Sequence, residues 1–364
     1  TRIKQNVRDG ADLLVFDPRE VQIAEYATQY SRVQPGYDAV WINGITRHII
    51  ENDLYDADFV AERTTGFEDV AEAVQEFTPE RVEEVSGVPP EEIASAAETI
   101  AAADTCVFGW TLGLTEHSHG TENVIAMANL AAITGNLGKP GTGVSPFRGQ
   151  NNVQGGGGDM GPLPDNFPGY QDVADDEIRA KFEDAWDCEI SPEYGYYTTQ
   201  MFLAADRDDV RGMYVIGENS ALSEPGVNHA EKILRDLDFL VVQDLFVTET
   251  AEYADVVLPA CSFVEKTGTF TNTDRTVQMV KQVMPPKGDS RPDWEILQAL
   301  ANRMGRDWDY DSTADIMDEV NSLTPLYGGI THERVDEEGG LQWPCWDGDH
   351  PGTTRLYEDE FNTD

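Results

Sequence analysis

The segment at residues 148–161 carries the residue types with the most evident chemistry in this chain. Arg148 is followed by Gly149 and Gln150, then by two asparagines and, after two further residues, by four consecutive glycines. A guanidinium can hold a planar carboxylate through two parallel hydrogen bonds, and carboxamides both donate and accept. Glycines let the backbone approach a ligand closely. The pattern predicts contact with a large polar ligand, and a flexible glycine-rich connector is the alternative.

The first apolar run of the chain ends at an aspartate, Asp17. Residues 11–17 read as a short buried strand that finishes at Asp17, and Pro18-Arg19 stops it. Open α/β sheets hold nucleotides just outside the carboxyl ends of their strands. Asp17 is therefore a candidate for nucleotide binding, and a helix cap or a turn acid is the alternative reading.

The histidines and cysteines do not predict a metal site. His117 and His119 are two positions apart with no third ligand nearby, which favours polar loop residues over a zinc pair. The four cysteines lie far apart in the sequence, and no pair has the spacing of a zinc or iron-sulfur motif. We interpret them as buried thiols in a reducing compartment.

Apolar strand-like runs alternate with helical patterns along the chain. This alternation predicts an α/β fold with two doubly wound, mostly parallel-sheet, Rossmann-like domains and a small β-hairpin insertion. The expected strands are 11–17, 105–109, 212–217, 239–244 and 255–259, and the expected helices are 37–52, 66–76, 79–84, 90–103, 120–134, 228–237 and 293–302. The last part of the chain is weakly patterned.

The length of 364 residues predicts more than one domain, since single cores usually stop growing near roughly 250 to 300 residues. We expect a first domain at 1–150, and a second at 151–262 and 292–364. The hairpin insertion is expected at 263–291. The chain starts at Thr1 without methionine, which suggests that a preceding part of a longer protein is missing.

The composition is strongly acidic, with 68 acidic against 25 basic residues and a formal net charge of -43. Such a charge opposes binding to nucleic acid and to anionic lipid, and it is best tolerated where salt screens it. A salt-rich cytoplasm is the natural inference. No apolar stretch approaches the roughly 20 residues of a membrane span, so we predict a cytoplasmic protein without direct membrane insertion.

Taken in order, the motifs of the chain resemble the catalytic subunit of molybdenum- or tungsten-dependent formate dehydrogenases, within the molybdopterin oxidoreductases. The resemblance covers essentially the whole chain, and the acidity points to a haloarchaeal type. Any single motif would be weak, but the ordered set is specific. The motifs are Asp17-Pro18-Arg19, residues 113–117 and 135–161, Gly217-Glu218-Asn219, Val242-Gln243-Asp244, residues 254–259 and residues 265–272.

The resemblance implies two molybdopterin guanine dinucleotides and one Mo or W atom, with each nucleotide lying across one α/β domain. At the position of Glu116 the family frequently has glutamine, so this residue departs from the family pattern. For Asn219 and Asp293, helix capping is the alternative to cofactor binding. The residues that the resemblance assigns to the cofactors are Asp17, Arg19, Gly113, Thr115, Glu116, Gly149 and Gln150 in the first domain, and Gly217, Asn219, Gln243, Asp244 and Asp293 in the second.

The resemblance also implies that Arg148 lies beside the metal, where it would orient formate. A surface salt bridge is the competing reading of this arginine. The family's metal-ligating cysteine or selenocysteine, the cysteines of its four-iron four-sulfur cluster and its C-terminal cofactor-closing domain have no counterpart in the sequence. We therefore expect the chain to be the central portion of the subunit, inactive alone, and to pass electrons to an acceptor subunit or carrier.

Two other functions remain open. One keeps the cofactor and changes the substrate, as in a nitrate reductase, although Arg148 and the following amides favour formate. The other is a molybdopterin-fold scaffold without cofactor, serving as a structural subunit.

Overall fold

The computed structural model of the chain describes residues 2–161 and 163–359. These residues form two compact units, each described by itself. The first runs to Gly149 and includes the residues from Arg355 onward, and the second runs from Gln150 to Thr354. Among the helices of the described residues, none is both long and apolar enough to cross a membrane.

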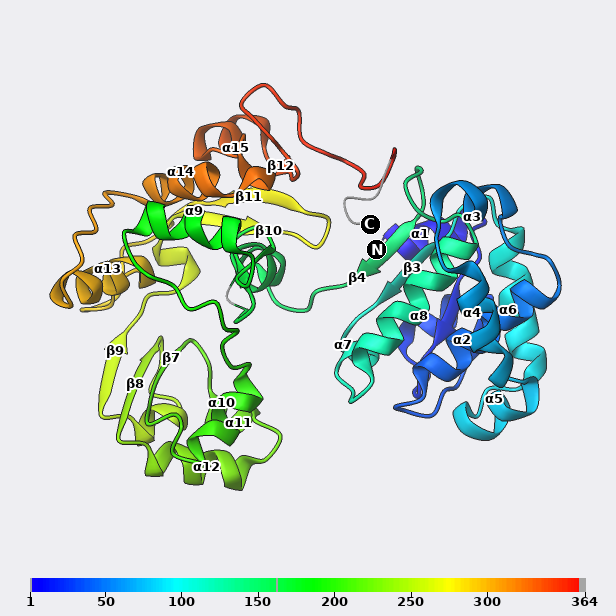
Figure 1. Cartoon of the computed structure of the whole chain (residues 1–364), viewed down its shortest axis with the longest axis horizontal. Helices are drawn as coiled ribbons and strands as arrows, with labels where there is room; N and C mark the ends of the chain where they lie inside the picture. The colour runs from blue at the N-terminus through cyan, green and yellow to red at the C-terminus, as the bar shows by residue number, and fades with distance from the viewer. Residues whose placement is uncertain (1, 162, 360–364) are drawn as a thin grey trace. The chain divides into compact units, whose positions relative to one another are not determined.

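The first unit combines parallel strand pairs with a layer of helices (Figure 1). Strand β1 pairs in parallel with β2, and β3 pairs in parallel with β4. The elements are α1 (Arg2–Arg8), β1 (Leu14–Phe16), η1 (Gln22–Tyr26), β2 (Gln29–Ser31), α2 (Asp38–Glu51), α3 (Ala57–Arg63), α4 (Phe67–Ala73), η2 (Val74–Glu76), α5 (Pro79–Ser86), α6 (Pro90–Ala102), β3 (Val107–Trp110), α7 (Leu112–Thr115), α8 (Gly120–Ile133) and β4 (Gly143–Pro146).

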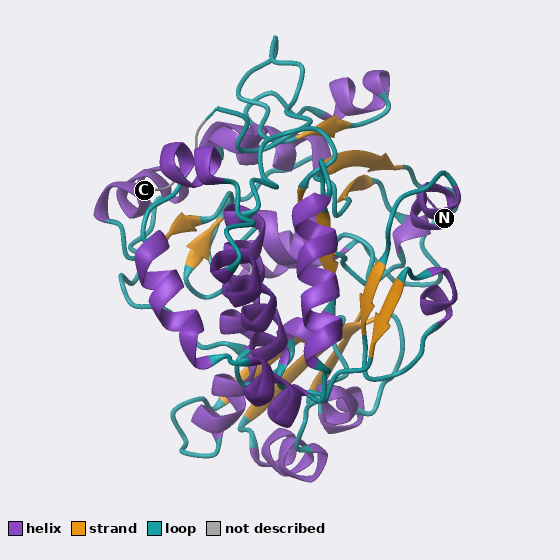
Figure 2. Ribbon diagram, turned by 90° about the vertical axis from the view of Figure 1, so that its right-hand side faces the viewer, coloured by secondary structure: helices purple, strands orange, loops and turns teal. Residues whose placement is uncertain are grey.

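Helix α2 forms the centre of the first core, packed between α6 and α8. Its residues Ile42, Ile45 and Ile49 recur at helical spacing and are fully buried. Gly44 on the same helix allows close packing on α5, because a Cβ there would lie 2.8 Å from a methyl group of Val82. Figure 2 shows the longer helices of this unit standing alongside one another.

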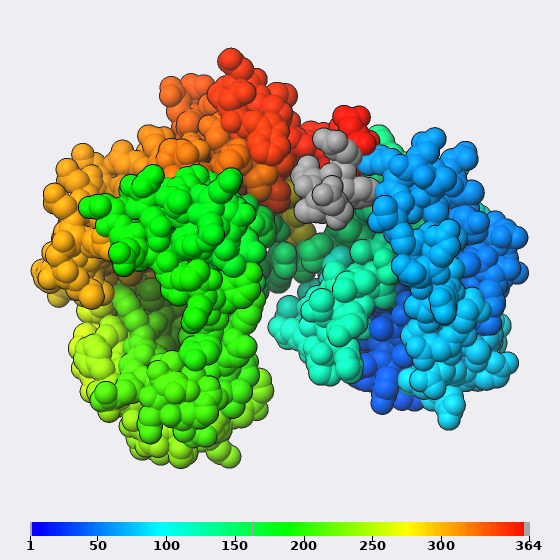
Figure 3. Space-filling model, viewed as in Figure 1, coloured from blue at the N-terminus to red at the C-terminus, as the bar shows by residue number. Residues whose placement is uncertain are grey.

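Local capping residues fix the ends of the short acidic helices. Thr78 accepts a hydrogen bond from the Arg81 amide at 3.3 Å, Pro79 opens α5, and Gly87 closes it at φ 75°. Helices α4 to α6 lie in the blue to cyan part of the surface in Figure 3. Their exposed acids, Glu80, Glu83, Glu84, Glu91 and Glu98 among them, show that the acid excess is solvated there.

The second unit contains a parallel sheet of order β7-β8-β9 and an antiparallel sheet of order β10-β11-β12. Its elements are η3 (Val153–Asp159), β5 (Asn166–Phe167), β6 (Gln171–Asp172), α9 (Asp176–Trp186), α10 (Thr198–Ala205), β7 (Gly212–Ile216), α11 (Ser220–Ser223), α12 (Val227–Asp236), β8 (Phe239–Asp244), η4 (Thr250–Tyr253), β9 (Val256–Pro259), η5 (Phe263–Glu265), β10 (Gly268–Thr271), β11 (Thr276–Val280), α13 (Asp293–Arg303), α14 (Thr313–Leu323), η6 (Pro325–Tyr327), α15 (His332–Glu338) and β12 (Leu341–Gln342).

The central strand β8 and helix α12 make the core of the parallel sheet. Leu240 and Val242 of β8 are buried against Ile233 and Leu234 of α12. The predicted α/β class with parallel sheets is thus confirmed, and the expected hairpin is the β10-β11 pair. Strand β11 also pairs with β12, a partner that the sequence did not suggest.

The weakly patterned last part of the chain proved to be ordered structure. It contains α14, α15 and β12, and α14 begins with a capping box in which Ser312 and Asp315 satisfy each other's backbone amides. The Ser-x-x-Asp spacing was the sequence signal for this helix start. The division into functional domains at 150, 262 and 292 stays a prediction.

Candidate functional site

Arg148 lies just beyond the carboxyl end of the β3-β4 pair in the first unit. Strand β4 ends at Pro146, opposite Trp110 of β3, and the Phe147 amide continues the ladder by donating to the Trp110 carbonyl at 2.6 Å. Gly109 makes room for Phe147, since a Cβ at this position would lie 2.4 Å from the ring. Arg148 and Gly149 are exposed and follow this anchored phenylalanine directly.

The loop and short helix after β3 carry three predicted cofactor residues, Gly113, Thr115 and Glu116, all of which are exposed. The buried Asn123 of α8 fixes this segment, because its Nδ2 donates to the Leu114 carbonyl at 2.8 Å. Its Oδ1 accepts from the Ala39 amide at 2.9 Å, which ties the same segment to the start of α2. Asn123 was not predicted as a site residue, because it lies inside an apolar helix pattern.

His117 and Asp38 form a second polar group near this loop. His117 Nε2 lies 2.8 Å from the Gly113 carbonyl, and Trp41 Nε1 donates to the Asp38 carboxylate at 3.3 Å. Burial raises the pKa of Asp38, against the opposing effects of the Trp41 hydrogen bond and of the nearby His117. Within the described residues, no group of three or more His, Cys, Asp or Glu side chains could hold a metal ion.

Asp17 and Arg19 form a tight turn at the end of β1. The Asp17 Oδ1 atom accepts a hydrogen bond from the Arg19 amide at 2.7 Å. The Asp17 carbonyl accepts from the hydroxyl of Tyr30, at 3.0 Å. One carboxylate oxygen of Asp17 therefore stabilises a turn, as the alternative interpretation of this residue had it. Binding of a nucleotide by Asp17 stays a prediction.

In the second unit, Asn219 joins the loops that follow β7 and β8. Its Oδ1 atom accepts from both the amide and the hydroxyl of Thr250, at 3.1 and 2.9 Å, and its Nδ2 donates to Glu249 at 2.7 Å. The side chain does not cap helix α11, which it precedes. Gly217, two positions earlier, has φ +62° and open space around the position of a Cβ.

Gln243 and Asp293 are 50 positions apart in sequence and in direct contact in the structure. The fully buried Gln243, near the carboxyl end of β8, donates from Nε2 to Asp293 Oδ1 at 2.7 Å. Its Oε1 accepts from the Tyr214 hydroxyl, and Lys266 Nζ forms an ion pair with Asp293 Oδ2. Burial raises the pKa of the Tyr214 hydroxyl, and the Asp293 charge adds to that effect, so this hydroxyl keeps its proton for donation.

Asp293 is therefore not a helix cap, the alternative that its position had left open. Pro292 is the N-cap residue of α13. The nearby Asp244 accepts from the backbone amides of Leu245 and Phe246, at 2.6 and 3.2 Å, which shapes the loop after β8. Tyr214 and Lys266 were not among the predicted site residues, although Lys266 stood within a motif that carried the resemblance.

A cavity of about 270 Å³ adjoins Asp293 and Lys266. The rest of its lining includes the aromatic side chains of Phe263, Phe270 and Trp294 and the polar side chains of Asn152, Thr267, Thr269 and Thr313. The cavity thus combines aromatic and polar side chains with one ion pair, which suits a planar ring that carries polar groups at its edge.

The glycine-rich segment forms one π-helical stretch, η3, which the sequence did not predict. Its last residue, Asp159, is fully buried and accepts four side-chain hydrogen bonds. Gln154 Nε2 and the Tyr170 hydroxyl donate to Oδ1 at 2.8 and 2.9 Å, and the Tyr327 hydroxyl and Trp343 Nε1 donate to Oδ2 at 2.5 and 2.7 Å. Burial raises the pKa of Asp159, and the four donors act against this rise.

Asn152, just before η3, makes a second attachment by accepting from the Thr271 amide of β10 at 2.9 Å. Gly155 has to be glycine here, because a Cβ would lie 2.3 Å from Asn152 Oδ1. Gln150 is exposed at the start of the second unit. The segment is therefore held by specific contacts, unlike a flexible connector.

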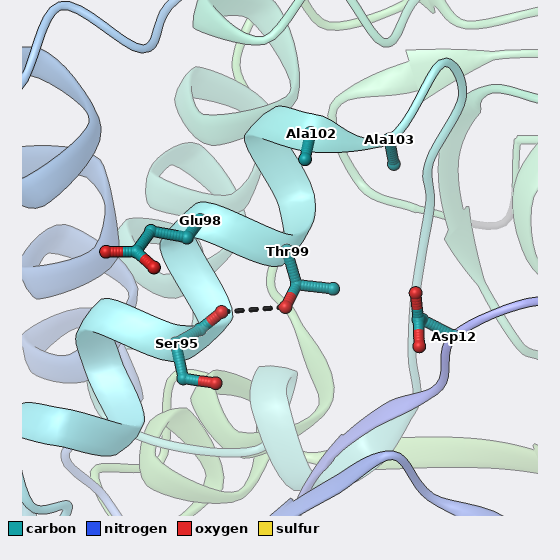
Figure 4. A pocket seen from close by; sticks show the side chains of 6 residues that line it. All are labelled: Asp12, Ser95, Glu98, Thr99, Ala102 and Ala103. Carbon is teal, nitrogen blue, oxygen red and sulfur yellow. Dashed lines mark hydrogen bonds between the residues drawn. The ribbon is translucent and has the colours of Figure 1, made fainter.

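A larger cavity, of about 420 Å³, lies elsewhere in the first unit (Figure 4). It is lined by Asp12, before the amino end of β1, and by side chains of α6 such as Glu98 and Thr99. No predicted site residue lines it. It lies at the opposite end of β1 from Asp17 and does not coincide with the candidate site.

Parallel sheets with acids, amides and glycines at their carboxyl ends define an α/β protein. The chain belongs to the molybdopterin oxidoreductase family, whose sequence profile matches residues 1–303. A solved structure of acetylene hydratase from Pelobacter acetylenicus has the same fold, with a TM-score of 0.73 over 98% of this chain and 52% of that one. The two are 21% identical in sequence.

Curated relatives include two staphylococcal proteins assigned as formate dehydrogenases. The protein of Staphylococcus haemolyticus is 44% identical over 354 residues, which are 97% of this chain. The protein of Staphylococcus aureus strain USA300 is 41% identical over 355 residues, which are 98% of this chain. The match spans 36% of the length of each relative.

Proposed function

We propose that the chain is part of a formate dehydrogenase catalytic subunit that binds two molybdopterin guanine dinucleotides with molybdenum or tungsten. The reaction is the oxidation of formate to carbon dioxide, with release of one proton and two electrons. The observation that carries the proposal is the position of Arg148, exposed and two residues beyond the carboxyl end of β4. The assignment of the staphylococcal relatives supports formate as the substrate.

The residues of the second unit fit a guanine dinucleotide by their chemistry. A guanine edge offers adjacent N–H donors, and the Asp293 carboxylate has acceptor capacity beyond its bonds to Gln243 and Lys266. The cavity beside Asp293 has aromatic side chains against which a base could stack. Gly217 leaves open space where a backbone could approach a pyrophosphate.

The first unit fits the second nucleotide in a similar way. Gly113 and Gly149 both have open space around the position of a Cβ, so a ligand could approach the backbone there. At the end of β3, the buried Trp110 Nε1 has no hydrogen-bond partner among the described residues, and an orphaned donor of this kind is rare in a closed core. Asp17, Arg19, Thr115 and Glu116 are the further residues proposed for this nucleotide.

In this proposal the bound metal centre supplies the two-electron redox chemistry. Arg148 would bind formate through two parallel hydrogen bonds and fix the direction of its C–H bond. Carbon dioxide is neutral, so the attraction to the guanidinium falls when the product forms and release is favoured. Gln150 is proposed as a contact to the pterin.

Several finer points stay predictions. These are the four-iron four-sulfur cluster, the electron-acceptor subunit or carrier, the cytoplasmic location and the haloarchaeal type. We also expect the 364 residues alone not to oxidise formate, because none of their cysteines stands in a motif for the metal ligand. The alternatives are another molybdopterin oxidoreductase, such as a nitrate reductase, and a scaffold without cofactor.

Two measurements on the protein that contains this chain test the proposal. Metal and pterin analysis separates both enzymes from the scaffold, which would contain neither. Reduction of a redox dye on addition of formate, compared with oxidation of the reduced dye on addition of nitrate, separates the two enzymes. A protein loaded with metal and pterin that reduces no dye with formate would overturn the assignment of formate.

A further inference from the structure

Four side chains of the second unit form a chain of hydrogen bonds with a defined direction. The acceptor-only Asp293 carboxylate takes a hydrogen bond from Gln243 Nε2 on β8, and Gln243 Oε1 in turn accepts from the Tyr214 hydroxyl on β7, which holds the amide in this orientation. Lys266, after η5, approaches the same carboxylate from its other oxygen. Side chains from three elements that are distant in sequence thus contact the Asp293 carboxylate at the start of α13, either directly or through Gln243.

The contacts leave the Asp293 carboxylate as an acceptor only. Gln243 occupies Oδ1 and Lys266 occupies Oδ2, and an ionised carboxylate has about four lone-pair sites in all. Each oxygen therefore keeps room for one more donor. The Asp293 side chain is 31% exposed and that of Lys266 is 29% exposed, so a ligand can reach both.

The amide orientation matters because glutamine can present either of its two ends. Without the Tyr214 hydroxyl, Gln243 Oε1 would lose its donor, and the amide would be held toward Asp293 by one contact in place of two. Without Lys266, Asp293 Oδ2 would lose its cation, and the carboxylate could turn away from the orientation in which both oxygens face a ligand.

We propose that Lys266 and Tyr214 are positioning residues that make Asp293 selective for a guanine edge over an adenine edge. This inference rests on the proposed function, in which Asp293 contacts a guanine dinucleotide. Guanine presents two adjacent N–H donors, hypoxanthine presents one, and adenine presents a ring acceptor that an ionised carboxylate repels. Fixing the carboxylate as a two-point acceptor disfavours adenine, because the adenine amino group can satisfy only one oxygen while the ring acceptor faces the other.

The test measures nucleotide binding to the whole chain prepared without cofactor, by calorimetry with GDP, IDP and ADP as probes. The variants are Lys266→Met, Lys266→Arg and Tyr214→Phe. The matched control is Lys281→Met, which breaks the exposed ion pair with Asp336. Thermal unfolding of each variant reports whether it has folded.

We expect the unchanged chain to prefer GDP over ADP by about tenfold or more, with IDP between them, since each mismatched polar group is left without its hydrogen bond. Lys266→Met should remove most of this preference for GDP, and Tyr214→Phe should reduce it severalfold. Lys266→Arg, which keeps the cation, should keep the preference. A purely structural role of Lys266 would weaken all three nucleotides equally. Lys281→Met should bind like the unchanged chain.

The proposed function and the inference about guanine selectivity can fail separately. No preference for GDP in the unchanged chain would count against guanine binding, and therefore against the proposed function. A GDP preference that persists in Lys266→Met and Tyr214→Phe would overturn the inference and leave the proposed function standing. If Lys266→Met does not fold, the folded Tyr214→Phe variant decides, and unchanged selectivity in it overturns the inference.

Discussion

Trp343 donates its indole Nε1–H to Asp159 Oδ2 at 2.7 Å, across 184 positions of the sequence. The bond ties the end of the glycine-rich segment to the residue that follows β12. Tyr327 donates to the same oxygen from η6. A carboxylate with no exposed surface thereby connects three parts of the second unit that have no local contact in sequence.

Removing this carboxylate should destabilise the second unit. Asp159→Ala removes the acceptor of three buried donors, on Gln154, Tyr327 and Trp343, and each such loss costs about 1–3 kcal/mol, so we expect at least about 3 kcal/mol in total. Trp343→Phe removes one donor and should cost about 1–2 kcal/mol. Urea unfolding followed by circular dichroism measures both. The exposed Asp184→Ala is the control, and equal midpoints for Asp159→Ala and Asp184→Ala would contradict the prediction.

Substitution of Arg148 should affect turnover more than cofactor content. In the proposed formate dehydrogenase, Arg148→Lys keeps the charge but cannot form two parallel hydrogen bonds to a carboxylate. We expect kcat/KM for formate to fall by about a hundredfold or more, with metal content nearly intact, since orientation effects of this kind are large. The control is Arg211→Lys in an exposed ion pair. Unchanged formate kinetics would reject the role of Arg148.

His332 should make folding stability depend on pH in the acidic range. Burial lowers the pKa of His332 below 6.5, with Asp318 opposing, and its Nε2 has no partner among the described residues. The unfolded chain therefore binds the proton more readily, so the His332 contribution is present above pH 6.5 and is lost as the pH falls through the folded-state pKa.

His332→Gln should flatten this part of the stability profile, measured as unfolding free energy between about pH 5 and pH 7. The exposed His119→Gln is the control. A profile for His332→Gln with the same slope as that of the unchanged chain would show that His332 is not responsible.

The acid excess should make folding depend on salt. With a net charge of -43, repulsion between exposed carboxylates falls when the Debye length shrinks from about 10 Å at 0.1 M salt to about 3 Å at 1 M. We expect the unfolding midpoint to rise with potassium chloride. Sucrose at matched osmolality is the control for general solute effects. The same midpoint in dilute and molar potassium chloride would remove the hypothesis.

The sequence predicted the local elements well where a single periodicity governs them. Helix α2 was expected at 37–52 and spans Asp38–Glu51, and β8 was expected and found at 239–244. Apolar spacing fixes which face of such an element is buried, so local sequence is sufficient. Helix α14, with 11 residues, was missed because it lies in a stretch rich in Gly, Asp and Trp, where its capping residues were the main local signal.

The sequence by itself determined the α/β class, the strand ends and the residue types available at each of them. The tertiary structure decided which side chains meet there, such as Lys266 with Asp293, and Trp343 with Asp159. The reason is physical. A local pattern encodes burial and backbone conformation, whereas the partner of a buried polar group depends on which distant element the fold brings within hydrogen-bond reach.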